Sequence, residues 1–104
     1  MGNEGWIILT TAPDESAAAA LVTALVEAGV VACGTLVPKV RSIYRWDGRL
    51  EDTSETLVIC KTTAERIDTA EAMVADLHPH EVPEFMALPA GRVAPSYLSW
   101  LQGT

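Results

Sequence analysis

The dipeptide Asp47-Gly48 interrupts a long stretch of strand-forming residues, and it constrains the fold more than any other feature of the chain. Val, Ile, Thr and aromatic residues are frequent over 30–46, and the stretch 49–61 has a similar character. Asp-Gly is a preferred sequence for the type I′ turn of a two-residue hairpin loop. The sequence therefore predicts one long hairpin with strands over 30–46 and 49–61 and an exposed tip.

Pro38 lies inside the first of these strands, where it cannot donate a hydrogen bond to the ladder. It predicts an edge position or a bulge, so we expect the hairpin to be bent. With the turn at Asp-Gly, Thr35 lies opposite Cys60, and Cys33 becomes a diagonal neighbour of Cys60 on the same face. A bulge at Pro38 would shift this register by one residue, and two separate, buried thiols are the alternative.

The N-terminal segments carry a strand signal and then a helix signal. Residues 6–11 form an apolar run between Gly5 and Pro13, as in a buried strand. Residues 13–28 are predicted to be helical, because Pro13 suits a first helical turn and Gly29 suits a C-terminal stop.

The second half of the chain repeats the pattern. Thr62 and Glu65 have the spacing of a capping box, which predicts a helix over 63–77, ended by Pro79. A final strand is expected over 82–88 and a short terminal helix around 97–101.

The predicted order is strand, helix, strand, strand, helix, strand, helix. This is an α+β, ferredoxin-like βαββαβ sandwich with an antiparallel sheet and an extra C-terminal helix. The length of 104 residues, without a linker or a repeat, predicts a single domain over 1–104. Such folds host metal chaperones, acyl phosphatases, RNA binders and regulators, so the fold alone does not name a function.

Charge and hydropathy exclude several classes of partner. Fourteen acidic and seven basic residues leave a net charge of -7, which argues against nucleic acid and anionic membrane surfaces as partners. No apolar run approaches the ~18 residues of a membrane span, and the start of the sequence lacks the pattern of a signal peptide. We therefore expect a soluble, cytoplasmic protein in which the two cysteines, 27 residues apart, stay reduced. The lack of a CxxC motif argues against a simple thiol metal site.

Both histidines fall within seven residues, 78–84, together with two glutamates and two prolines. Imidazole nitrogens and carboxylate oxygens suit zinc, copper or nickel, so His78, His80 and Glu81 are candidate ligands for a divalent cation. The alternative is a stiff turn that leads from a helix end into a strand.

Catalytic motifs are missing from the sequence. No serine lies in a nucleophile elbow. An acyl phosphatase needs an anion-binding loop before the first helix, whereas this chain has Asp14 and Glu15 there. We therefore expect no enzymatic activity and no organic cofactor.

Six motifs in order resemble one known family. They lie at 10–15 (TTAPDE), 32–38 (ACGTLVP), 42–49 (SIYRWDGR), 61–62 (KT), 78–84 (HPHEVPE) and 97–101 (YLSWL). In this order they are similar to the motifs of the CutA divalent-cation-tolerance family, and the resemblance covers almost the whole chain from residue 7 to 101.

The resemblance implies a tight homotrimer, similar in architecture to PII signalling proteins, in which the long hairpin reaches across to a neighbouring sheet. It also implies a response to divalent metals, copper among them. Metal binding in the family is assigned to a thiol, whose place Thr10 takes here, and to paired histidines, of which Leu77 replaces one and His78 is retained. His80 stands where the family has a tyrosine.

A second set of residues matches the family motifs and is expected at a subunit cleft. It comprises Tyr44, Trp46, Lys61, Glu84 and Trp100, with Glu81 beside them. Aromatic rings with a cation and carboxylates are typical of a small-ligand pocket, but subunit interfaces also favour Trp and Tyr.

The function that this resemblance implies is a trimeric divalent-cation tolerance protein that binds copper or another divalent cation weakly through His78, helped by His80 or Glu81. The alternative is a PII-like sensor that binds a small anionic metabolite near Tyr44, Trp46 and Lys61. A third possibility is a scaffold for partner proteins.

Overall fold

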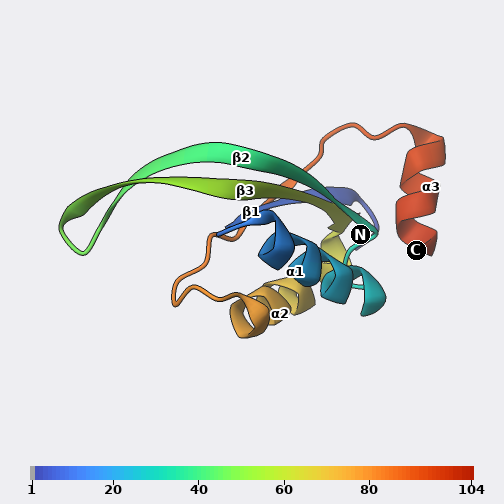
Figure 1. Ribbon diagram of the computed structural model, residues 1–104. Coiled ribbons are helices and arrows are strands. Elements are labelled where there is room, and N and C mark those ends of the chain that lie inside the picture. The colour runs from blue at the N-terminus through green and yellow to red at the C-terminus, as the bar shows by residue number, and fades with distance from the viewer. Residues whose placement is uncertain (1) are drawn as a thin grey trace.

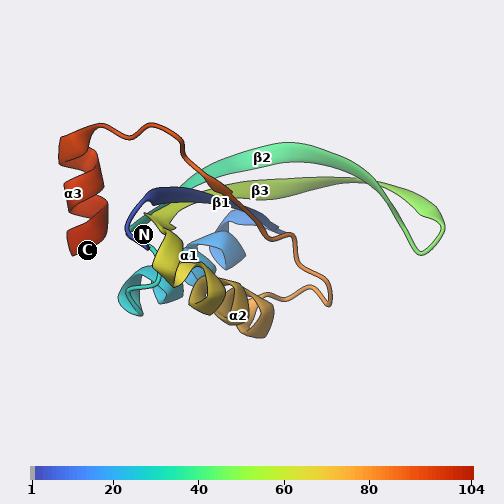
Figure 2. The same cartoon turned by 180° about the vertical axis from the view of Figure 1, so that it is seen from behind.

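Four strands form one antiparallel sheet in the order β2-β3-β1-β4 in the computed structural model, which describes residues 2–104 (Figure 1). The elements are β1 (Gly5–Ala12), α1 (Glu15–Glu27), β2 (Cys33–Trp46), β3 (Arg49–Thr63), a 3-10 turn η1 (Ala64–Arg66), α2 (Ile67–Leu77), β4 (Met86–Pro89) and α3 (Pro95–Gly103). Both α1 and α2 lie on one face of the sheet, and α3 lies beyond its end (Figures 1 and 2). The predicted α+β, ferredoxin-like arrangement with an extra C-terminal helix is confirmed.

The long β2-β3 hairpin is also confirmed. Asp47 and Gly48 both have positive φ, 52° and 78°, as a type I′ turn requires, and Trp46 pairs with Arg49 across it. The two strands extend well past β1, whose last residue, Ala12, lies opposite Thr56. The outer part of the hairpin therefore arches away from the sheet as a two-stranded ribbon (Figure 1).

A bulge at Pro38 and Lys39 bends β2, as predicted. The register shifts between Val37 and Val40, and Lys39 has a φ of 61°. In the part of β2 that precedes the bulge, the register therefore differs by one residue from the predicted one. Cys60 lies opposite Gly34 there, instead of opposite Thr35.

The shift also separates the two thiols. Cys33 pairs with Lys61, so it points to the opposite face from Cys60. The predicted same-face proximity of Cys33 and Cys60 is wrong, because one extra residue in β2 reverses the facing of the residues before it. Both cysteines are free, and Cys60 is buried.

Helix α1 is shorter than the predicted 13–28, because Asp14 is its N-cap and the first helical residue is therefore Glu15. The Asp14 carboxylate accepts a hydrogen bond from the Ala17 amide at 2.8 Å, and Glu15 follows in the first turn. The helix ends before Gly29, whose φ of 74° is the left-handed conformation expected after a C-cap.

The predicted capping box at Thr62 and Glu65 is wrong. Thr62 still belongs to β3, and its hydroxyl donates to the carbonyl oxygen of Val30 at 2.8 Å. The chain enters α2 through the 3-10 turn instead, and the helix ends at Leu77 just before Pro79, as predicted. Strand β4 spans only Met86–Pro89 rather than 82–88, because the preceding loop binds to the end of β1, as described below.

The hydrophobic core fills the space between the sheet and the helices α1 and α2. Its buried members include Ile8, Leu25, Val58 and Val74. Side chains alternate along each strand, so the neighbours of Ile8 and Val58 point to the face that α1 and α2 leave open. This open face is apolar and carries Ile7, Leu9, Leu57, Ile59, Met86 and Leu88.

No helix within residues 2–104 combines the length and the apolar character needed to cross a membrane.

Replacing Gly34 by alanine should destabilise the fold. A Cβ atom at this position would lie 2.7 Å from Val22 Cγ1 and 3.2 Å from Cys60 Sγ. Overpacking of a core contact typically lowers the free energy of unfolding by about 1–3 kcal/mol. Urea unfolding at one fixed protein concentration measures this loss for Gly34→Ala. Gly103→Ala is the matched control, because its Cβ would meet nothing within 4 Å.

A second substitution identifies the clash. In a Val22→Ala background, Gly34→Ala should lower the free energy of unfolding less than it does in the wild type, because the Val22 methyl groups that clash with the added Cβ are gone. An equal loss in both backgrounds would contradict this explanation.

Stability should fall at high pH through Cys60. Burial raises the pKa of the Cys60 thiol to about 11, from 9.0 in the unfolded chain. Between these pH values the unfolded chain loses a proton that the native state keeps, so the free energy of unfolding decreases as pH rises. We expect wild type to lose on the order of 2 kcal/mol more than Cys60→Ala between pH 8 and pH 11.

Denaturant unfolding of wild type and Cys60→Ala at both pH values measures the difference. Equal slopes for wild type and Cys60→Ala would rule out this assignment.

Candidate functional site

A pocket of about 730 Å³ lies between the β2-β3 hairpin and the loop that joins α2 to β4. The ribbon view shows the hairpin arching over this loop (Figure 1). The hairpin contributes Ser42, Ile43, Tyr44, Trp46 and Glu55, and the loop contributes Pro79, His80, Glu81, Val82 and Glu84. Thr11, at the end of β1, completes the lining. Five residues predicted from the sequence as ligands or cleft residues therefore meet here.

His78 holds the start of this loop against β1. Its side chain is buried, 7% exposed, and Nε2 lies 2.5 Å from the carbonyl oxygen of Thr11. A carbonyl oxygen only accepts, so Nε2 carries the proton, while Nδ1 accepts the backbone N–H of His80 at 3.0 Å. Both ring nitrogens of His78 are thus engaged, and His78 could bind a metal only by giving up one of these hydrogen bonds.

Thr10 holds the end of the same loop. Its hydroxyl is fully buried and donates to the carbonyl oxygen of Glu84 at 2.6 Å. The sequence marked Thr10 only as the residue in the place of a family thiol, whereas the structure gives it a positioning role. Hydrogen bonds therefore hold both ends of the loop against the C-terminal part of strand β1, at Thr10 and Thr11.

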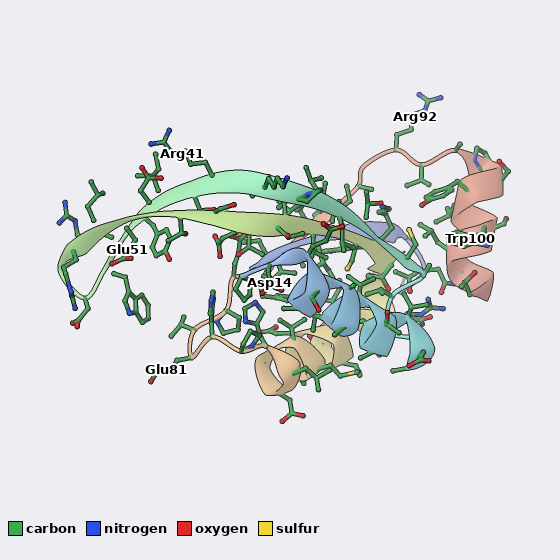
Figure 3. All side chains as sticks on the ribbon, in the orientation of Figure 1. Asp14, Arg41, Glu51, Glu81, Arg92 and Trp100 are labelled. Carbon is green, nitrogen blue, oxygen red and sulfur yellow. The ribbon has the colours of Figure 1, made fainter. Side chains whose placement is uncertain are left out.

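His80 has a different environment from His78. Its ring is exposed and stands 4.9 Å from the ring of His78, centroid to centroid, and its imidazole nitrogens make no hydrogen bond within residues 2–104. Glu81 points outward from the loop into solvent (Figure 3). Within the part of the chain that the structure describes, no three His, Cys, Asp or Glu side chains are grouped to hold a metal ion. The metal site at His78, His80 and Glu81 stays a prediction.

The predicted cleft residues divide into two groups in a single chain. Tyr44, Trp46 and Glu84 line the 730 Å³ pocket, but Lys61 and Trp100 do not. Glu51, the partner of Tyr44, and Lys61 are ten residues apart on β3, about 33 Å of extended strand. That separation is the reason why one chain does not bring the whole set together.

Lys61 lies at the far end of the sheet and lines a smaller pocket of about 290 Å³ with Trp6, Arg92 and Tyr97. Its ammonium group donates to the Thr35 hydroxyl at 2.6 Å. Trp100, on α3, stands beside Tyr97 with 5.6 Å between ring centroids. The Tyr97 hydroxyl in turn lies 3.8 Å from Cys33 Sγ, so this end of the molecule is cationic and aromatic.

Glu55 is the pocket residue that the sequence did not reveal. It lies on β3 just beyond the end of β1 and is 8% exposed. Its carboxylate makes no hydrogen bond and no ion pair within residues 2–104, and the pocket lining includes no Lys or Arg. The nearby guanidinium of Arg41 is engaged by Asp52 at 2.6 Å on the outer side of the hairpin (Figure 3).

Comparison with known proteins agrees with the resemblance seen in the motifs. The family model for CutA1 divalent ion tolerance protein matches residues 6–104. The chain is 40% identical over 96 residues to the divalent-cation tolerance protein CutA of Thermus thermophilus, covering 92% of this chain and 93% of the relative. It is 36% identical to the protein of the same name from Pectobacterium atrosepticum, covering 94% and 89%.

Solved structures show the same fold. The crystal structure of CutA from Xylella fastidiosa superposes with a TM-score of 0.93 at 33% identity, covering 96% of each chain. The divalent cation tolerance protein Cut A1 from Thermus thermophilus gives 0.91 at 38% identity, covering 95% of this chain and 96% of that one. With agreement in sequence and in fold along nearly its whole length, the chain belongs to the CutA1 divalent ion tolerance protein family.

Proposed function

We propose that this protein is a non-enzymatic, homotrimeric divalent-cation tolerance protein that binds copper or another divalent cation weakly at the mouth of the 730 Å³ pocket. The observation that carries the proposal is the exposed imidazole of His80, which makes no hydrogen bond within residues 2–104 and lines the same acidic pocket as Glu55, Glu81 and Glu84. Imidazole nitrogen and carboxylate oxygen together suit divalent transition metals. Fewer than three grouped ligands in one chain agrees with weak binding.

The proposal transfers the main ligand role from His78 to His80. His78 has both nitrogens in hydrogen bonds, and one of these bonds fixes the backbone of His80. His78 therefore acts as a positioning residue for His80, and Glu81 remains a candidate second ligand.

The open face of the sheet supports self-association. Its exposed apolar side chains include Met86 and Leu88, 61% and 40% exposed, next to Leu9 and Ile59 on the neighbouring strands. A contiguous apolar sheet face of this kind is usually covered by a partner. A second and third copy of the chain would cover it, as the family resemblance implies.

Charge also supports a ring of subunits. One end of the chain presents Glu55, Glu81 and Glu84, and the other end presents Lys61 and Arg92. Head-to-tail contacts bring unlike ends together and close into rings. In such a ring Lys61 and Trp100 of one subunit would approach Tyr44, Trp46 and Glu84 of the next, which restores the cleft set predicted from the sequence.

The PII-like alternative gains support at a different place from the one expected. Lys61 and Arg92 line the 290 Å³ pocket, and no carboxylate side chain is part of its lining. A small anionic metabolite could therefore pair with these two cations. The pocket around Tyr44 and Trp46 carries carboxylates and repels anions. The proposed compartment is the cytoplasm, where the two free thiols would stay reduced.

Removal of the His80 imidazole should weaken metal binding. We expect His80→Ala to lower the affinity for zinc and copper at least tenfold in titration calorimetry, because it removes the free nitrogen ligand. His78→Ala is the matched comparison. It should lower the thermal stability, since a buried hydrogen bond is lost, and weaken metal binding less than His80→Ala does.

Wild-type affinity in His80→Ala would contradict the assignment, and so would a larger loss of affinity in a folded His78→Ala protein.

A charge on the open sheet face should break the assembly. Wild type is expected to show three times the chain mass of 11.1 kDa in light scattering. Leu9→Lys should shift this to the mass of one chain, because a lysine on the apolar face cannot be buried between subunits without a partner. Val26→Lys, on the exposed surface of α1, should leave the mass unchanged. A wild-type mass of one chain would disprove the trimer.

A further inference from the structure

Helix α3 lies beyond the end of the sheet, and the segment 90–94 connects it to β4 (Figure 2). Its nine residues are too few for a stable helix in water without contacts to the rest of the protein. The main apolar contact is Leu101, which is 2% exposed. A Cβ atom added to Gly5 of β1 would lie 3.5 Å from Leu101 Cδ1, so α3 packs directly on the backbone of β1. The position of α3 therefore depends on a small number of contacts.

A guanidinium group from another element holds the C-terminal turn of α3. Arg66 donates from Nη1 to the carbonyl oxygen of Leu101 at 3.3 Å and from Nη2 to that of Gln102 at 3.2 Å. The last carbonyl groups of a helix have no partner within the helix, and the helix dipole favours a cation beside them. The last turn of α3 contains no basic residue of its own. Arg66 supplies that charge from the start of α2.

The position of Arg66 is unfavourable for its own helix. Arg66 is the N-cap residue of α2, and its side chain makes no capping hydrogen bond there. N-cap positions favour Ser, Thr, Asp and Asn, and the positive end of the helix dipole repels a cation. The two bonds to α3 offset this local cost, which identifies the attachment of α3 as the role of Arg66.

Once attached, α3 provides the aromatic part of the cationic end of the chain. Tyr97 lines this end together with Lys61 and Arg92, and Trp100 stands beside Tyr97 with 5.6 Å between ring centroids. In a single chain the two residues are 40% and 46% exposed, so a second copy can contact both rings. The direction in which these rings point is set by the orientation of α3.

We propose that Arg66 is a positioning residue for the boundary between subunits. By fixing the C-terminal turn of α3, it sets the orientation in which Tyr97 and Trp100 meet the acidic end of the next copy. Arg66 lines neither of the two pockets and acts only through α3. The proposal rests on the homotrimer proposed above and adds a residue remote from its cleft.

The first test is amide hydrogen exchange of the full chain at neutral pH. In Arg66→Ala we expect the amides of residues 98–103 to exchange at least tenfold faster than in wild type, because α3 loses its polar attachment. Arg66→Lys keeps the charge but not the planar pair of donors, so it should accelerate exchange less. Glu65→Gln is the matched control. It changes an exposed charge in the same 3-10 turn and should leave the exchange of α3 within twofold of wild type.

The second test is dissociation of the assembly on dilution, followed by light scattering. Arg66→Ala should raise the dissociation constant of the trimer at least tenfold, and Arg66→Lys should raise it less. Gly34→Ala separates positioning from stability, because it strains the contact between β2 and α1 and leaves α3 untouched. It should keep both the exchange of α3 and the dissociation constant within twofold of wild type. If Arg66→Ala folds poorly, Arg66→Lys carries both tests, with changes in the same direction.

Wild-type exchange of α3 in folded Arg66→Ala would overturn the proposal, and so would faster exchange with an unchanged dissociation constant. An equal effect of Arg66→Ala and Gly34→Ala on dissociation would also overturn it, because loss of stability would then explain the result. A wild-type mass of one chain would refute the trimer and the boundary with it. Exchange of α3 reports on Arg66 alone, so failure of this proposal is distinguishable from failure of the trimer.

Discussion

The extra residue at Pro38 and Lys39 decides which side chains the hairpin presents to each of its faces. Before the bulge, Gly34 lies opposite Cys60, and the absence of a side chain there lets Val22 of α1 approach the sheet. After the bulge, Val40 lies opposite Glu55, and the ribbon bends away from β1. The core below the sheet and the pocket under the hairpin both depend on this one shift in register.

The second constraint is the attachment of the 78–84 loop to β1. Two buried polar side chains, Thr10 and His78, bind the loop at its ends through hydrogen bonds. Buried polar groups of this kind specify geometry because an unmade bond would be costly. They hold His80 and Glu84 opposite the aromatic wall of the hairpin, which gives the pocket its shape.

The two histidines illustrate how one motif divides into two roles. They are two residues apart, yet His78 faces the protein and has both nitrogens engaged, whereas His80 faces the pocket with its nitrogens free. Thr10, where the family resemblance led us to expect a thiol, uses its hydroxyl within the fold. A cation that entered this pocket would therefore meet carboxylates and one imidazole, in keeping with the net charge of -7.

Local signals in the sequence were enough to determine the order of elements, the Asp47-Gly48 turn, the bulge and the end of α2 at Pro79, because each depends on backbone preferences of neighbouring residues. Family membership also followed from the sequence, since the motifs lie in order along it. Tertiary structure alone decided the facing of Cys33, the bond of Thr62 to Val30, the occupied nitrogens of His78 and the burial of Glu55. These features rest on contacts between residues 32 to 74 positions apart, or on a register that changes with a single inserted residue, and no local pattern records either.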